Sequence, residues 1–141
     1  MERANTITGH LFCVFSAPQP DVSRAPADAI YLRRRADARV LATLLGHLYE
    51  SNGIGITTSD DEVVPPTALP ALEAAISSAI VQVEAQPATW PVLLGYRDQE
   101  LRDAIVEPAS RQILLGFLRA VLAEIRLADQ RGRYLHWCGG E

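Results

Sequence analysis

The chain has 141 residues and no lysine, because all thirteen of its basic side chains are arginine. The absence of lysine excludes Schiff-base chemistry and a P-loop lysine on a nucleotide phosphate. Hydrophobic residues make up 48% and charged residues 21%, which is typical of a folded protein, and the length predicts one domain over residues 1–141. The net charge of −4 argues against nucleic-acid binding, which requires basic residues to neutralise phosphates.

The N-terminal segment, residues 7–15, is rich in β-branched and aromatic side chains and predicts a strand. Its apolar run from Leu11 to Phe15 is too short for a signal peptide or a membrane span, and no later stretch reaches about eighteen apolar residues. We therefore expect a cytoplasmic protein without membrane contact, and its many alanines and arginines are typical of bacteria. Residues 16–28 contain several prolines and predict an extended connector.

Residues 31–52 predict an amphipathic helix, and Ser51-Asn52-Gly53 predicts its end, with Gly53 in the left-handed conformation. Three arginines, at positions 33–35, fall in its first turn. There we expect a solvated face with an ion pair between Arg33 and Asp37, with anion recognition as the alternative. The apolar stripe of this helix consists of Val40, Leu41, Leu44, Leu45 and Leu48.

Residues 54–58 are a candidate short strand, and residues 59–66 predict an acidic loop that ends in two prolines. Asp60, Asp61 and Glu62 in this loop suggest a site for a divalent cation. Adjacent acidic side chains point apart, however, and the spacing of a calcium loop is absent, so we expect a solvated turn without metal. Residues 67–85 predict a second helix with Thr67 as its N-cap.

Residues 92–96 are another candidate strand, and residues 108–131 predict a third helix. Apolar side chains spread over about 200° of its circumference, twice the width of an ordinary surface stripe. Such a helix must be covered on more than one side, either at the centre of the domain or in a homodimer contact through residues 110–130. Its narrow polar strip holds Gln112, Arg119, Arg126 and Gln130.

Residues 133–138 predict a final strand, because Tyr134, His136 and Cys138 alternate with Leu135 and Trp137. Together these segments predict an α+β fold: a single domain dominated by three amphipathic helices, with a small sheet made from the terminal strands. An all-α bundle is the alternative.

The two cysteines, Cys13 and Cys138, lie in the first and last predicted strands. Without an export signal we expect two reduced thiols, and a disulfide between them is the alternative. Pairing of these strands would also collect His10 and His136, and two cysteines with two histidines are a normal zinc set. Positions 10 and 13 point to opposite faces of a regular strand, however, so we expect core thiols and ordinary histidines instead of a metal site.

A thiol enzyme would use Cys138 as nucleophile with His136 or His10 as its base. A catalytic thiol requires a lowered pKa and rigid donors for an oxyanion, and Cys138 is followed only by two glycines and a glutamate in this sequence. The chain also lacks the Gly-x-Ser-x-Gly pattern of serine hydrolases. We therefore expect no catalytic residue and no cofactor, and keep a small hydrolase or thiol enzyme as an alternative.

Arg119 and Arg126 are candidate anion-binding residues, because a spacing of seven places both on one face of the third helix. They could clamp a carboxylate or phosphate, as in a small-molecule sensor with Trp90 or Trp137 in its pocket. The alternative interpretation is that they form the water-facing strip of a buried helix.

Our leading functional hypothesis is a non-enzymatic interaction protein that binds a basic protein partner. An antitoxin or toxin-immunity protein, whose acidic surface blocks a cationic effector, is the concrete form of this hypothesis. The small-molecule sensor and the thiol enzyme or hydrolase are the alternatives. The residues expected to contact the partner are Asp60, Asp61, Glu62, Asp98, Glu100 and Asp103.

Overall fold

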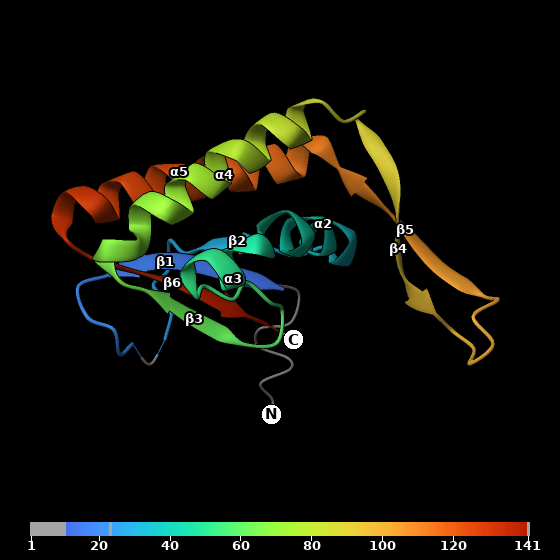
Figure 1. Ribbon diagram of the computed structural model, residues 1–141, viewed down its shortest axis with the longest axis horizontal. Coiled ribbons are helices and arrows are strands. Elements are labelled where there is room, and N and C mark those ends of the chain that lie inside the picture. Colours follow the sequence, from blue (N-terminus) through green and yellow to red (C-terminus); the bar gives the residue numbers. More distant parts are fainter. Residues whose placement is uncertain (1–10, 23, 141) are drawn as a thin grey trace.

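A four-stranded antiparallel sheet is the base of the computed structural model, which describes residues 11–22 and 24–140 (Figure 1). Its central strands are β1 (Phe12–Ala17) and β6 (Tyr134–Gly139), which come from opposite ends of the described chain. The edge strands are β2 (Ile30–Leu32) and β3 (Asp61–Val64), in the order β2-β1-β6-β3. The predicted sheet of terminal strands is therefore confirmed and gains two further strands.

Alternation along β1 and β6 gives the sheet an inner face and an outer face. Phe12 and Val14 of β1 and Leu135 and Trp137 of β6 are fully or almost fully buried on the inner face, within the main hydrophobic core. The side chains between them point to the other side of the sheet, as the predicted alternation of residues 133–138 requires. This outer face carries Cys13, Phe15, His136 and Cys138.

Two long helices, α4 (Leu69–Glu84) and α5 (Arg111–Arg131), lie side by side over the inner face (Figure 1). The α5 helix ends at Gly132, whose φ of 64° is the left-handed conformation that glycine adopts without strain. Strands together with helices make the fold α+β, as predicted, and exclude the all-α bundle. None of the helices in the described residues is long and apolar enough to cross a membrane.

The α5 helix buries a narrower stripe than its composition predicts. Its fully buried residues occupy an arc of about 100°, which is the ordinary width for one-sided packing. Ile113 is 39% exposed, and Leu115 and Leu122 are half-buried. Most of the apolar surface that suggested a homodimer through residues 110–130 is covered by α4 and the sheet of the same chain. The buried residues are Leu114, Phe117, Leu118, Val121, Ile125 and Ala128.

The predicted helix over residues 31–52 is wrong at its start and in its middle. Ile30–Leu32 form strand β2, because they pair with Phe12–Val14 of β1. The helix α2 (Arg35–Leu45) begins only after them, and Gly46 separates it from α3 (His47–Asn52). The predicted end is confirmed, since α3 stops before Gly53 with a φ of 70°.

A hairpin of β4 (Thr89–Tyr96) and β5 (Ala104–Ser110) extends away from the sheet and the long helices (Figure 1). The candidate strand over residues 92–96 is confirmed and is longer than predicted. β5 was not expected, and the third helix begins at Arg111 instead of Pro108, because Pro108 belongs to this strand. Ser110 caps the helix by accepting a hydrogen bond from the backbone nitrogen of Ile113, 3.2 Å away.

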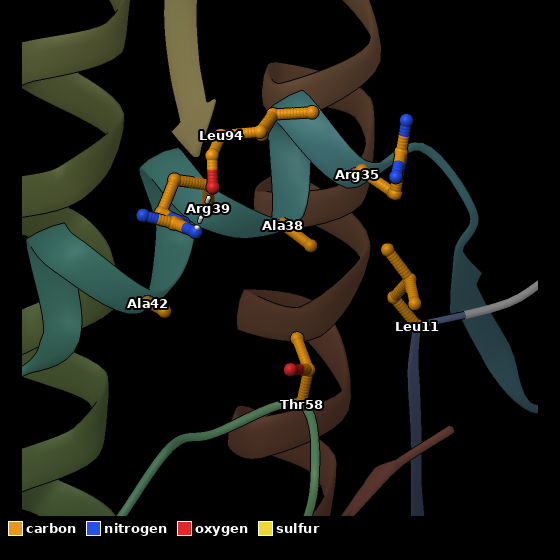
Figure 2. Close-up of a pocket in the computed structure, with 7 residues that line it drawn as sticks. All are labelled: Leu11, Arg35, Ala38, Arg39, Ala42, Thr58 and Leu94. Carbon is orange, nitrogen blue, oxygen red and sulfur yellow. Dashed lines mark hydrogen bonds between the residues drawn. The ribbon is translucent and has the colours of Figure 1, made fainter. Parts of the chain in front are cut away.

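The helix α2 and the residue before it, Arg34, anchor the hairpin through polar side chains. Arg35 forms an ion pair with Glu107, Arg34 donates to the Pro108 carbonyl, and Arg39 donates to the Leu94 carbonyl over 2.9 Å (Figure 2). The Arg33–Asp37 pair expected from their spacing is wrong, because Asp37 pairs with Arg34 at 3.3 Å. Arg33 instead lies over the Tyr31 ring, 5.0 Å from its centre. Two of the three clustered arginines thus hold the hairpin.

Three further local predictions are wrong. Residues 54–58 form no strand, although Ile54 and Ile56 are buried in the core. The predicted loop over residues 59–66 instead contains strand β3, which pairs with β6 over Asp61–Val64. Thr67 does not cap α4, because it lies inside a 3₁₀ turn (Pro66–Ala68) that precedes the helix. The predicted connector begins later than expected, because Ser16 and Ala17 belong to β1.

Candidate functional site: a pocket on the outer face of the sheet

Four chemically active side chains form a row across the outer face of the sheet. In the strand register Tyr31 lies opposite Cys13, Cys13 lies opposite Cys138, and Cys138 lies opposite Asp61. Residues that are directly opposite in neighbouring antiparallel strands point to the same face. The row therefore runs through all four strands, from β2 to β3.

A second row lies beside the first and holds the connector in place. Phe15 is opposite His136, and their rings stack with centres 4.8 Å apart. The Nε2 atom of His136 is 3.0 Å from the carbonyl oxygen of Gln19, which lies in the connector. A carbonyl can only accept, so Nε2 carries a proton and donates it. His136 is 4% exposed and therefore serves as an attachment point for residues after β1.

The connector and the outer face enclose a pocket of about 440 Å³, here called the sheet pocket. Its walls are the two rows together with Glu62 of β3 and connector residues, including Asp21, Val22 and Arg24. A volume of this size falls in the range of pockets that bind small ligands. The pocket brings together five residues singled out from the sequence, namely Cys13, Asp61, Glu62, His136 and Cys138.

A smaller cavity of about 190 Å³ lies between α2, Leu94 of the hairpin and Thr58 (Figure 2). Arg35 and Arg39 line it, but both guanidinium groups already hold the hairpin. Anion recognition by the arginines of the first turn, our alternative for this segment, is therefore not favoured in this cavity.

The sheet pocket has an excess of negative charge. Two carboxylates, from Asp21 and Asp61, line it together with one guanidinium, that of Arg24. Glu62 also borders the pocket, but its position opposite Trp137 directs its side chain to the inner face. Glu62 accepts a hydrogen bond from the backbone nitrogen of Gly55 over 2.9 Å. Within residues 11–22 and 24–140, the structure shows no hydrogen bond or ion pair to the exposed carboxylate of Asp61. Asp61 is thus available to a ligand, and so is Asp21, which is exposed and shows no partner among the same residues.

The environment of the two cysteines disfavours their thiolate forms. Burial raises the pKa of Cys138 to about 12, and the negative charges of Asp61 and Cys13 act in the same direction. Burial also raises the pKa of Cys13, although a hydrogen bond with Tyr31 opposes this shift. An activated nucleophile requires the opposite change. The described residues also show no hydrogen bond between His136 and Cys138, and His10 lies outside these residues, so the geometry does not support a thiol enzyme.

The zinc set that was considered for the two cysteines and two histidines, and not expected, has no counterpart in the part of the chain that the structure describes. No group of three or more histidine, cysteine or acidic side chains there is arranged to hold a metal ion. Both cysteines are free thiols and face each other across β1 and β6. His10, the remaining member of the set, is not among the described residues.

The six predicted partner-contact residues separate into two groups. Those from Asp60 to Glu62 lie at the start of β3, whereas Asp98, Glu100 and Asp103 lie at the tip of the hairpin, at the far end of the molecule (Figure 1). The Asp98 carboxylate accepts from the backbone nitrogens of Arg102 and Asp103, at 3.0 and 2.8 Å. Asp103 also pairs with Arg97 at 3.2 Å. Two of the three tip acids therefore stabilise the turn, and one continuous acidic surface is absent from this arrangement.

The two candidate anion-binding arginines are bound to acidic side chains of α4. Arg119 pairs with Glu84 at 2.9 Å, and Arg126 pairs with Glu73 at 3.1 Å. All these pairs lie on the solvent side of the two helices, which agrees with the interpretation of a water-facing strip. Trp137, a candidate wall of a ligand pocket on α5, is 1% exposed and packs edge-on against Phe117 in the core.

Comparison with protein-family models, with curated proteins and with solved structures finds no match to this chain.

Proposed function

We propose that this protein binds a basic protein partner and that the sheet pocket receives a cationic side chain of that partner. The observation that carries the proposal is the charge of the pocket: the carboxylates of Asp21 and Asp61 line it with one guanidinium, and Asp61 lacks a partner within the described residues. A guanidinium group forms charge-assisted hydrogen bonds with such a carboxylate.

The walls of the sheet pocket suit the remainder of a long basic side chain. Val22 and Val63 offer apolar surface beside the Phe15–His136 stack. Arginine and lysine bury their alkyl stems against such surface while their charged ends remain near acidic groups. The net charge of −4 over the whole chain would speed the approach of a basic partner. An antitoxin or toxin-immunity protein is the form of this function that we favour.

A labelled tetra-arginine peptide, titrated at low ionic strength, tests this function. We expect Asp61→Asn to weaken its binding about fivefold, which corresponds to about 1 kcal/mol for a partly exposed charge pair. Glu100→Gln is the matched control: Glu100 was also expected to contact the partner, but it lies at the tip of the hairpin and does not line the sheet pocket, to which the proposal assigns the contact. Its affinity should remain close to that of the wild type.

Equal weakening by both variants would indicate diffuse attraction to an acidic protein and would contradict a role for the sheet pocket. Absence of measurable binding would contradict the proposal as well. The same pair of variants can then be used to examine any basic protein that is captured from the source organism.

A further inference from the structure

The two cysteines of the chain are placed for a bond across the central strands of the sheet. Cys13 of β1 is directly opposite Cys138 of β6. The backbone nitrogen of Gly140 donates to the Leu11 carbonyl over 3.0 Å. Leu11 and Gly140, which lie two residues along the strands from Cys13 and Cys138, are therefore a hydrogen-bonded pair. Such pairs recur at every second residue, so Cys13 and Cys138 form one too, with Cα atoms about 5.5 Å apart. This separation lies within the range of disulfides.

The bond would nevertheless be strained. Directly opposite side chains have Cβ atoms about 4.5 to 5.5 Å apart, whereas a disulfide requires about 3.5 to 4.5 Å. The strands must therefore move together by roughly 1 Å at this point. Strain of this kind makes a disulfide easier to reduce, which is the property of reversible and not of permanent structural bonds.

The sheet pocket gives a small reagent access to the thiols. Cys13 and Cys138 both line it, and these are the two cysteines of the whole sequence. Cys13 is 4% exposed and Cys138 is half-buried, so Cys138 is the thiol that a reagent meets first.

We infer that Cys13 and Cys138 are a reversible oxidation site, which closes to an intramolecular disulfide on reaction with a low-molecular-weight disulfide such as glutathione disulfide. The Cys138 thiol loses its proton to solvent and attacks one sulfur of the reagent, which releases one glutathione thiolate and leaves a mixed disulfide. Cys13, after losing its proton, attacks the Cys138 sulfur and releases the second glutathione. The protein loses two electrons and two protons, and glutathione disulfide becomes two thiols.

This inference does not depend on the proposed function, because it concerns the thiols and not the carboxylates of the sheet pocket. It is tested by equilibrating the full-length protein in glutathione buffers of increasing disulfide content. The free thiols are then blocked with N-ethylmaleimide and the products are identified by mass spectrometry. We expect a species that is lighter by two hydrogen atoms, that carries no maleimide, and that returns to the dithiol when reduced glutathione is restored.

Two comparisons show whether the pairing of β1 with β6 in the folded protein is what allows the disulfide to close. The equilibrium constant for closure should be at least about tenfold larger in the folded protein than in urea, where a loop of almost the whole chain must close. A variant with Cys13→Ser and Ala17→Cys keeps two thiols on the same face, but displaces one by roughly 13 Å along the strand. This variant should stop at mixed disulfides.

Three results would overturn the inference. They are a wild-type protein that retains both thiols, one that accumulates only mixed disulfides, and a closure constant no larger in the folded protein than in urea. If the displaced variant fails to fold, the comparison of folded and unfolded wild type still decides the question.

Discussion

The carboxylate of Asp37 accepts a hydrogen bond of 2.7 Å from the backbone nitrogen of Ser110, and this contact joins two segments that are distant in the sequence. Asp37 lies in α2 and is fully buried, and Ser110 is both the end of β5 and the N-cap of α5. Arg34 completes the arrangement with an ion pair to the second oxygen of Asp37, at 3.3 Å. One acidic side chain thus positions the base of the hairpin and the start of the longest helix.

Replacement of Asp37 should show how much this contact stabilises the fold. Asp37→Ala leaves the Ser110 N–H without its acceptor, and we expect a loss of about 1 to 3 kcal/mol in the free energy of unfolding. Asp37→Asn keeps an oxygen for Ser110 and should cost less than the alanine variant. Urea denaturation of the three proteins measures both values. An alanine variant as stable as the wild type would show that the contact contributes nothing net.

The same residue predicts a dependence of stability on pH. Burial raises the pKa of Asp37 above its ordinary value of 3.8, although the hydrogen bond from Ser110 and the charge of Arg34 oppose the shift. Between pH 3.8 and the folded-state pKa, Asp37 is therefore protonated in the folded state and already ionised in the unfolded state. As the pH rises from about 3.8 through the folded-state pKa, the wild type should lose stability relative to Asp37→Asn. Denaturation of both proteins across this interval checks the sign, and a difference that is constant or changes in the opposite direction would contradict it.

Oxidation of the thiol pair should stabilise the protein, since it would restrict the unfolded chain. Closing a loop of about 125 residues contributes up to about 4.9 kcal/mol by the chain-entropy relation. Strain at the Cys13–Cys138 position must reduce this gain, so we expect a clearly smaller stabilisation. Thermal unfolding of the oxidised and reduced proteins under identical conditions measures it. A lower midpoint for the oxidised protein would mean that strain exceeds the entropic gain.

The reactivity of Cys138 should report the charge of the sheet pocket. With a pKa of about 12 against an ordinary value of 9.0, Cys138 should be alkylated by iodoacetamide much more slowly than an unhindered thiol at neutral pH, because far less of it is present as thiolate. The rate should rise about tenfold for each pH unit while the protein remains folded. Asp61→Asn removes a negative charge that raises this pKa and should accelerate the reaction, whereas Glu100→Gln should not. Peptide mapping identifies the alkylated cysteine, and equal rates in the two variants would count against the influence of Asp61.

Several parts of the fold could be predicted because their signals are local. The period of apolar side chains located α4 and α5, and the glycines after α3 and α5 marked the ends of those helices. Alternation from Tyr134 to Cys138 predicted a strand with two distinct faces, and it placed His136 and Cys138 on the same face. These features depend on neighbours within a few residues, so the amino-acid order determines them directly.

The sheet pocket was decided by the tertiary structure. Ile30–Leu32 and Asp61–Val64 are too short to be strands by themselves, and they form strands because β1 and β6 supply hydrogen-bond partners. The row from Tyr31 through the two cysteines to Asp61 then follows from the register between strands that are far apart in the chain. The order of residues determined which side chains were available and how each segment would fold locally. The side chains of this row lie together only because strands that are far apart in the chain pair in one particular register. A shift of one residue in that register would turn the shifted side chains to the opposite face of the sheet.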